Sequence, residues 1–258
     1  MSAEQPFIAW WNLQNFFAPN PTKRLDQFPL RVQASIAKQF KDWDQAAFDA
    51  KLAHLIAVLA RMNKKRGPDL LGACEIENKT VLDDLAKTLG QKTGRDYQVI
   101  HHDSPDFRGI DVAFLCDRDL FASEGEPVSH NIVKRYPTRD IFEATVRVKH
   151  GPLKGKRLFL LGNHWPSRSG GQYETEPFRI MVAENVSALV EKILVADENA
   201  KIIVMGDLND EPGNRSVTDY LLAIREKEPG VRKKPGGVQN RDRDGEHPFK
   251  PYLYNPTS

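Results

Sequence analysis

Residues that could perform chemistry gather in four short motifs, and one of them is Gly-Asp-Leu-Asn-Asp at 206–210. It directly follows the run Lys-Ile-Ile-Val-Met at 201–205, which has the composition of a strand. Alternate residues of a strand share a face, so Asp207 and Asn209 would point the same way. The carboxylate could hold a divalent ion or a water nucleophile, and the amide could donate to a phosphoryl oxygen. Because Gly, Asp and Asn are also turn residues, an ordinary strand-to-turn junction fits this motif equally well.

A second carboxylate, Glu75, ends the apolar run Leu70–Cys74. An acidic residue at such a place more commonly begins a helix, but it could also bind a hard cation such as Mg²⁺. Glu77 competes for this role, because strand alternation points both side chains the same way.

The third motif is a polar residue, Asn12, inside the aromatic stretch Trp10–Phe17. Burying its amide without a partner would cost about 1–3 kcal/mol, so a metal site or a carboxylate should lie nearby. Asn15 is the alternative for the same role.

The fourth motif surrounds His164, which follows the run Arg157–Asn163 and precedes Trp-Pro-Ser-Arg. A histidine that leaves a strand beside these residues could protonate or hydrogen-bond a phosphate oxygen. The alternative is a histidine that packs in the core without a chemical role.

Strands and helices must position these motifs. Apolar and β-branched runs predict strands at 7–16, 69–75, 97–101, 110–116, 131–135, 141–149, 157–163 and 201–205. Helical spacing predicts helices over about 46–62, 78–92 and 176–196. Turn-rich connections, including a hairpin loop at 151–155, indicate antiparallel pairing in the middle of the chain. Residues 18–41 contain three prolines, and we expect them to be irregular.

The composition fits a soluble globular protein, with 258 residues, 40 % hydrophobic and 28 % charged. The net charge of +2 neither indicates nor excludes a nucleic-acid partner, because a nuclease needs only a locally basic groove. Cys74 and Cys116 lie in apolar runs without metal-ligand spacing, which predicts buried thiols and no cysteine-based metal site. No segment approaches the ~20 apolar residues of a membrane span, and we expect a cytoplasmic protein.

In chain order, the motifs around Asn12, Glu75, His164 and Asp207 resemble those of the endonuclease/exonuclease/phosphatase superfamily. The resemblance runs from about residue 7 to 212 and is most specific at 206–209 and 163–168. The stretch Arg-Gly-Ile-Asp-Val-Ala-Phe at 108–114 is similar to bacterial nuclease-like members. The fold implied is an α/β (α+β) four-layer α/β/β/α sandwich of two mostly antiparallel sheets, within one domain over 1–258.

The resemblance also implies roles for nine residues. Asn12 and Glu75 would bind Mg²⁺ or Mn²⁺. Four residues would act on water and the phosphoryl group: Asp207 on the water or a second ion, Asn209 on a phosphate oxygen, and His164 on the phosphoryl group, oriented by Asp111. Substrate phosphate would be bound by Arg139, Arg168 and Asn163.

The chain departs from the family at its C-terminal side. The family closes with an Asp-His pair that supplies a general base, and this sequence has no such pair. After Asp210 the one histidine is His247, within the charged segment 224–250, which we predict to be a mobile loop. We therefore expect a chain truncated at its C-terminus, with an incomplete second sheet and feeble activity by itself. A fragment of a longer protein is favoured over a frame-disrupted gene.

The predicted function is divalent-metal-dependent hydrolysis of phosphodiesters, with DNA or RNA as the substrate. Two alternatives stay open. One is an inositol-phosphate or phospholipid phosphatase or phosphodiesterase of the same superfamily. The other is a catalytically dead remnant that still binds metal and phosphate, which the missing Asp-His pair favours.

Overall fold

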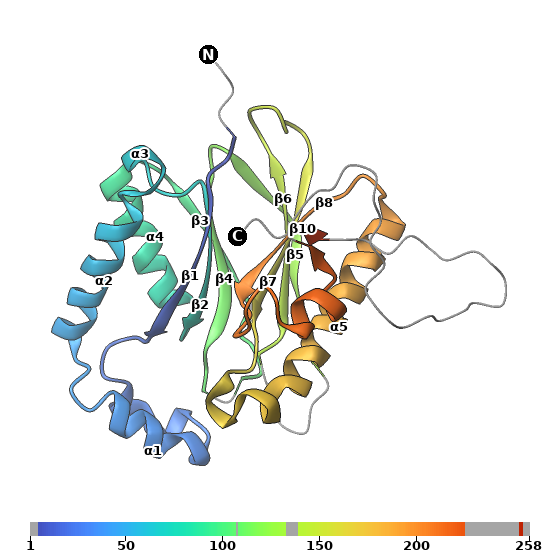
Figure 1. The fold of residues 1–258 in the computed structure, drawn as a ribbon. Coiled ribbons are helices and arrows are strands. Elements are labelled where there is room, and N and C mark those ends of the chain that lie inside the picture. Colours follow the sequence, from blue (N-terminus) through green and yellow to red (C-terminus); the bar gives the residue numbers. More distant parts are fainter. Residues whose placement is uncertain (1–4, 107, 133–138, 225–252, 255–258) are drawn as a thin grey trace. The chain divides into compact units, whose positions relative to one another are not determined.

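The computed structural model describes residues 5–106, 108–132, 139–224 and 253–254 (Figure 1). The chain divides into two compact units. The first comprises Met1–His164 and Lys201–Asp207, and the second comprises Trp165–Ala200 and Leu208–Ser258. The first unit contains both large sheets.

The first sheet has four strands in the order β1-β2-β4-β3. Their bounds are Ile8–Phe16 for β1, Leu70–Ile76 for β2, Tyr97–His101 for β3 and Asp111–Asp117 for β4. Strands β1 and β2 are parallel, while β4 is antiparallel to both β2 and β3.

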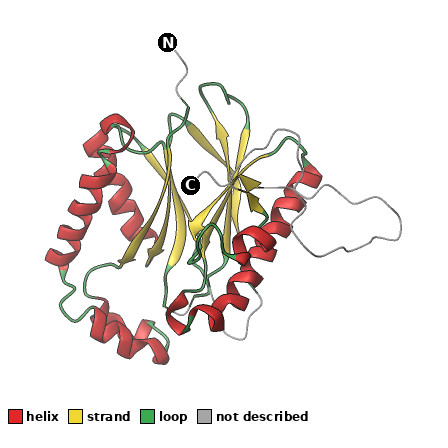
Figure 2. Cartoon of the chain, in the orientation of Figure 1, coloured by secondary structure: helices red, strands yellow, loops and turns green. Residues whose placement is uncertain are grey.

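Helices α2 (Gln45–Leu59) and α4 (Lys79–Thr93) cover one face of this sheet (Figure 2). The buried side chains between them and the sheet include Leu13, Phe16, Leu71, Phe48, Leu59, Leu82 and Leu85. Both helices begin at capping residues, since Asp44 and Asn78 accept hydrogen bonds from the N–H groups three residues later. The short helix α3 (Met62–Lys65) follows α2.

The expectation of an irregular segment at 18–41 is wrong. It contains the 3₁₀-helix η1 (Pro21–Gln27) and the helix α1 (Leu30–Gln39). Proline is tolerated at a helix start because the N–H that it lacks would have no helical partner there. Pro21 is the first residue of η1, and Pro29 directly precedes α1. The prolines therefore mark where helices begin.

The second sheet also has four strands, in the order β5-β6-β7-β8. Their bounds are Phe121–His130 for β5, Ile141–Val148 for β6, Arg157–His164 for β7 and Lys201–Asp207 for β8. Strands β5, β6 and β7 pair antiparallel, whereas β7 and β8 are parallel. The prediction of two mostly antiparallel sheets is confirmed.

The two sheets pack face to face through a shared apolar core (Figure 2). Phe114 of β4 stacks on Phe142 of β6 with ring centroids 5.5 Å apart. A glycine allows the close approach, because a Cβ on Gly162 would lie 2.6 Å from Cγ1 of Val112. The core between the sheets therefore depends on the absence of a side chain at Gly162 as well as on large aromatic side chains.

Strand β5 differs from the prediction, which placed a strand at 131–135. Residues 131 and 132 are not in a strand, and 133–135 lie outside the described residues. β5 is an edge strand whose register shifts between Glu124 and Val128, so it tolerates Gly125 and Pro127. β8 also differs from the expected buried strand, since it is half-buried. Within the described parts of the chain it lies at the other edge, and an incomplete second sheet stays a prediction.

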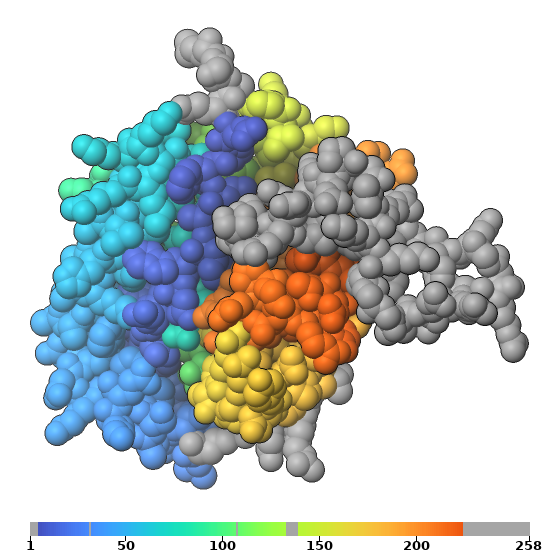
Figure 3. Space-filling view, in the orientation of Figure 1, coloured from blue at the N-terminus to red at the C-terminus, as the bar shows by residue number. Residues whose placement is uncertain are grey.

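The second unit is built around the helix α5 (Gln172–Ala196). The 3₁₀-helix η2 (Arg168–Gly170) and the π-helical turn η3 (Ser216–Tyr220) both contact α5. The start of α5 and the residues around η3 lie side by side on the surface (Figure 3). Two short parallel strands, β9 (Ala223–Ile224) and β10 (Leu253–Tyr254), complete the described part.

From residue 225 on, the predicted loop at 224–250 lies outside the described residues. Among the helices that the structure describes, none has the length and apolar character required to cross a membrane.

Candidate active site

Four of the predicted site residues lie on strands of the first unit: Glu75, His164 and Asp207 at the carboxyl ends of β2, β7 and β8, and Asn12 in the middle of β1. Asn12 is opposite Cys74 in the parallel pair β1–β2, and His164 is opposite Asp207 in the parallel pair β7–β8. The Nδ2 of Asn12 donates a hydrogen bond of 2.9 Å to Oδ2 of Asp207. This bond joins the two sheets across 195 positions of sequence. The carboxylate expected near Asn12 is therefore that of Asp207.

Glu75 reaches the same place through a local distortion of β2. Its φ of 61° lies in the left-handed region, which is uncommon for a residue with a side chain. The register between β2 and β4 shifts at this point, as in a β-bulge. The backbone N–H of Asn15 donates to Oε2 of Glu75 at 2.9 Å, and Oε1 lies 3.6 Å from Nε2 of His164. Such a conformation persists where surrounding contacts hold it, as they do here.

The contacts of Glu77 and Asn15 distinguish these residues from Glu75 and Asn12, for which the sequence left them as alternatives. Glu77 is anchored elsewhere, because its carboxylate accepts from the N–H of Ala18 at 2.6 Å and pairs with Arg24 at 2.8 Å. It ties the chain before η1 to the sheet. Asn15 contributes its backbone N–H to Glu75. The geometry therefore favours Glu75 and Asn12 for the site.

His164 is buried, and its Nδ1 has no hydrogen-bond partner within the described structure. Burial and the positive charges of Arg139 and Arg108 lower its pKa from the ordinary 6.5 to about 2. The Glu75 carboxylate would favour the cation, but at 3.6 Å it does not offset desolvation and two guanidinium groups. His164 is therefore neutral at physiological pH.

The predicted pairing of Asp111 with His164 is wrong. One carboxylate oxygen of Asp111 lies 2.8 Å from Nε2 of His101, and the other accepts from the N–H of Ser104 at 2.8 Å. His101 precedes Asp111 by ten positions, at the end of β3, and its sequence context gave no sign of this pair.

Arg139 lies directly beside the histidine. Its Nε donates to the carbonyl of His164 at 3.2 Å, and its Nη1 lies 3.4 Å from Oδ2 of Asp106. Burial lowers the pKa of Arg139, and the carboxylate of Asp106 opposes this shift. A guanidinium this deep keeps its charge, so it places a positive charge beside His164. The role of Arg139 as a phosphate anchor stays a prediction.

The other two predicted phosphate ligands are used within the protein. Asn163 is fully buried, and its Nδ2 donates to the carbonyls of Leu161 at 2.9 Å and Met205 at 3.5 Å. It links β7 to β8 and is inaccessible to a substrate, so its assignment is wrong. Arg168 lies in the second unit, where its guanidinium binds Asp210 and neighbouring residues. These contacts hold a loop together, and the role of Arg168 as a phosphate ligand stays a prediction.

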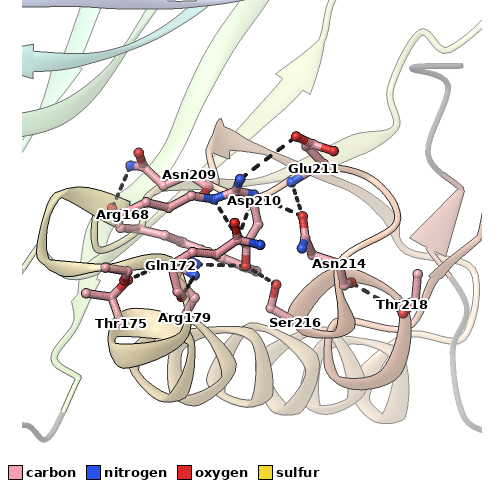
Figure 4. Close-up of polar contacts among 12 residues, drawn as sticks. Arg168, Gln172, Thr175, Arg179, Asn209, Asp210, Glu211, Asn214, Ser216 and Thr218 are labelled. Atoms are coloured by element: carbon pink, nitrogen blue, oxygen red, sulfur yellow. Dashed lines mark hydrogen bonds and ion pairs between the residues drawn. The ribbon is translucent and has the colours of Figure 1, made fainter.

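The contacts of Arg168 form a network centred on the buried carboxylate of Asp210 (Figure 4). Arg168 Nη2 lies 2.9 Å from Oδ1, and Arg179 Nε lies 2.8 Å from Oδ2, close enough for an ion pair although the N–H is poorly aligned for a hydrogen bond. The hydroxyl of Ser216 also donates to Asp210. Sequence reasoning missed this network, although a lone arginine among the inward positions of the helix 176–196 was a usable signal.

The same network fixes Asn209, whose φ of 50° is left-handed. Its carbonyl accepts from Arg168 Nε at 2.7 Å, and its Nδ2 donates to the carbonyl of Trp165 at 2.9 Å. Asn209 belongs to the second unit. Its contact with a phosphate oxygen stays a prediction.

Comparison with known proteins supplies the family. Residues 7–235 match the model of the endonuclease/exonuclease/phosphatase family. The chain belongs to this family. Among proteins with curated descriptions, none matches its sequence.

Solved structures show the same fold. A family protein from Bacteroides thetaiotaomicron is 17 % identical, with a TM-score of 0.54 over 84 % of this chain and 69 % of that one. A mannosyl-6-phosphatase from Bacteroides thetaiotaomicron VPI-5482 is 16 % identical, with a TM-score of 0.53 over 84 % and 70 %. The human nocturnin catalytic domain with bound sulfate is 18 % identical, with a TM-score of 0.50. That match covers 66 % of this chain and 61 % of the nocturnin chain, so the chain matches about three fifths of that length.

Enzymes of the endonuclease/exonuclease/phosphatase family are generally dependent on a divalent metal ion. Asn12, Glu75 and Asp207 offer amide and carboxylate oxygens at one edge of the sheets. Oxygen donors of this kind suit Mg²⁺ and Mn²⁺. The carboxylate of Glu75, at the bulge, lies 3.6 Å from Nε2 of His164. The residues present therefore fit a hard divalent ion.

Proposed function

We propose that this chain carries a divalent-metal-dependent phosphodiester hydrolase that acts on nucleic acid. The observation that carries the proposal is the bond between Asn12 and Asp207, which joins the two sheets beside Glu75 and a neutral His164. Nucleic acid is favoured because Arg108, with an exposed side chain, and the buried Arg139 supply two positive charges that act on His164 and could attract a phosphate.

Hydrolysis would proceed by in-line attack of water on phosphorus, with departure of the opposite ester oxygen. The carboxylate of Asp207, which accepts a hydrogen bond from Asn12, would orient the water and accept its proton. Glu75 and Asn12 would hold the metal ion, which when bound neutralises charge that develops on the phosphate.

The neutral ring of His164 keeps one N–H, which can donate to a phosphoryl oxygen without adding charge. Arg139 contributes a fixed positive charge beside it. The leaving oxygen takes its proton from solvent.

The test uses purified protein with plasmid DNA, RNA and bis-p-nitrophenyl phosphate, each with Mg²⁺, Mn²⁺ or EDTA. We expect metal-dependent cleavage that Asp207→Asn reduces ~10²–10⁴-fold, the range typical of a positioned base. Asp83→Asn, on the exposed face of α4, is the matched control and should keep the wild-type rate.

A second pair of variants tests the metal ligand. Glu75→Gln should weaken Mg²⁺ binding, because the amide loses the charge that a hard cation prefers. Glu77→Gln removes the partner of Arg24 and should change stability with little effect on metal affinity. Diester hydrolysis that survives both Asp207→Asn and EDTA would refute the proposal. Cleavage confined to phosphomonoesters, inositol phosphates or phospholipids would refute the nucleic-acid part.

A further inference from the structure

A thiol lies at the edge of the candidate active site. The Sγ of Cys74, one ring nitrogen of His164 and one carboxylate oxygen of Asp207 all lie within 4.8 Å of one another. These residues come from the ends of β2, β7 and β8, and all belong to the first unit. Cys74 directly precedes Glu75, but its side chain packs between the sheets with Leu70 and Val112. The spacing of residues along the chain does not reveal that Cys74 lies beside the site, which is why the sequence predicted no cysteine-based metal site.

The histidine supplies an independent sign of a ligand. Its side chain is only 3 % exposed, yet its Nδ1 has no hydrogen-bond partner among the described residues. Leaving a buried polar atom unsatisfied costs about 1–3 kcal/mol, and such an atom in a native protein calls for an explanation. An imidazole nitrogen that is neutral and without a proton is a lone-pair donor for a metal ion.

The donors differ in kind from those of the hard-ion site. Thiolate, imidazole and carboxylate together suit a borderline-soft ion, whereas Mg²⁺ and Mn²⁺ prefer oxygen ligands. Zn²⁺ binds sulfur at about 2.3 Å, and nitrogen or oxygen at about 2.0–2.2 Å, in tetrahedral geometry. In such a tetrahedron the ligand atoms lie ~3.4–3.6 Å apart, so the group needs to contract by at most ~1.4 Å. Side-chain rotation can supply that movement.

We propose that Cys74, His164 and Asp207 form a second metal site that selects Zn²⁺ and switches the enzyme off. As the S–Zn bond forms, the thiol of Cys74 releases its proton to solvent. Zn²⁺ then binds the lone pair of His164 and the carboxylate of Asp207, so that this carboxylate can no longer orient the water. The inhibitory half rests on the proposed function, whereas Zn²⁺ binding stands without it.

Binding is tested first, without any substrate. EDTA-treated protein is titrated with Co²⁺, which reports thiolate ligation by a sulfur-to-cobalt charge-transfer band, and with Zn²⁺ by calorimetry in excess Mg²⁺. We expect one Zn²⁺ per chain and the charge-transfer band in the wild type. Cys74→Ser and Cys74→Ala should lose the band and bind Zn²⁺ at least ~10–100-fold more weakly, since losing a group that merely hydrogen-bonds to a metal ligand already has that effect.

Cys116→Ser is the matched control, because Cys116 is also a buried thiol of the first sheet and lies outside the group. It should bind as the wild type does. Circular dichroism of each variant confirms folding, and two substitutions at Cys74 guard against one that disrupts the core.

Inhibition is tested second, as the fraction of each protein's own Mg²⁺-dependent rate that remains when Zn²⁺ is added. The wild type and Cys116→Ser should be inhibited, and the Cys74 variants should need at least tenfold more Zn²⁺. No charge-transfer band in the wild type, or an equal band in the Cys74 variants, would overturn the inference while leaving the proposed function standing. A chain that binds Zn²⁺ through Cys74 but cleaves no phosphodiester would overturn the proposed function and the inhibitory half alone.

Discussion

Replacing Asp210 by Asn should destabilise the second unit strongly. Asp210 and Arg179 each have side chains 1 % exposed, and Nε of the arginine lies 2.8 Å from the carboxylate. The amide keeps the shape but loses the charge, so the guanidinium of Arg179 is left buried without a counter-charge. Its remaining bonds, to Thr175 Oγ1 and to the carbonyl of Gln172, are made to neutral groups (Figure 4).

Removing one partner of a buried ion pair costs about 3–5 kcal/mol. Asp210 also accepts from Arg168, whose side chain is 30 % exposed, so that interaction adds little because solvent screens it. We therefore expect a loss of about 3–5 kcal/mol, which is a large part of the ~5–15 kcal/mol that holds an ordinary domain folded.

The assay is urea unfolding followed by circular dichroism. Asp219→Asn is the matched control, because Asp219 forms an exposed pair with Arg215 and should cost less than about 1 kcal/mol. If Asp210→Asn loses no more than this control, Arg179 is not held by that carboxylate. The network would then be no explanation for the left-handed conformation of Asn209.

Three further predictions concern the first unit. Asn12→Ala should lower kcat/KM about 10–100-fold, because Asp207 loses the donor that orients it; unchanged kinetics would contradict this. His164 should destabilise the protein as pH falls below 6.5, because the unfolded chain takes up a proton that the native site refuses. Between pH 7.5 and 5.5 the free energy of unfolding should fall by about 1.4 kcal/mol in the metal-free wild type, and urea titrations of His164→Asn should show no such fall. Gly162→Ala should cost about 1–3 kcal/mol in the same assay, since its Cβ would meet Val112, whereas Gly213→Ala has open space and should be near neutral.

The sequence predicted the elements that bury a regular face. The strands observed at 70–76, 111–117 and 201–207 correspond to the predicted strands at 69–75, 110–116 and 201–205, because apolar strands carry a strong local signal. Strand β5 was missed because an edge strand with a bulge accepts Gly125 and Pro127, which in a central strand would break the pairing.

Some features of the candidate site could be predicted from local sequence, whereas others depend on residues that are distant along the chain. Asp207 and Glu75 follow strands, and that placement was visible along the chain. The partner of Asp111 was not, because a carboxylate at a strand end pairs with whichever group the sheet order brings next to it. The order β2-β4-β3 brings His101, which residue types alone could not favour over His164.

Strand direction explains why these particular residues meet. In two mostly antiparallel sheets, the described parallel pairs of the first unit are β1–β2 and β7–β8, and each supplies two site residues from neighbouring positions of the paired strands. If β8 ran antiparallel to β7, the six steps along its seven residues would carry Asp207 to the opposite end, about 20 Å from His164 at ~3.3 Å per residue. The hydrogen bond from Asn12 would then be impossible. The helical crossover that makes β8 parallel to β7 is therefore as necessary to the site as the carboxylate itself.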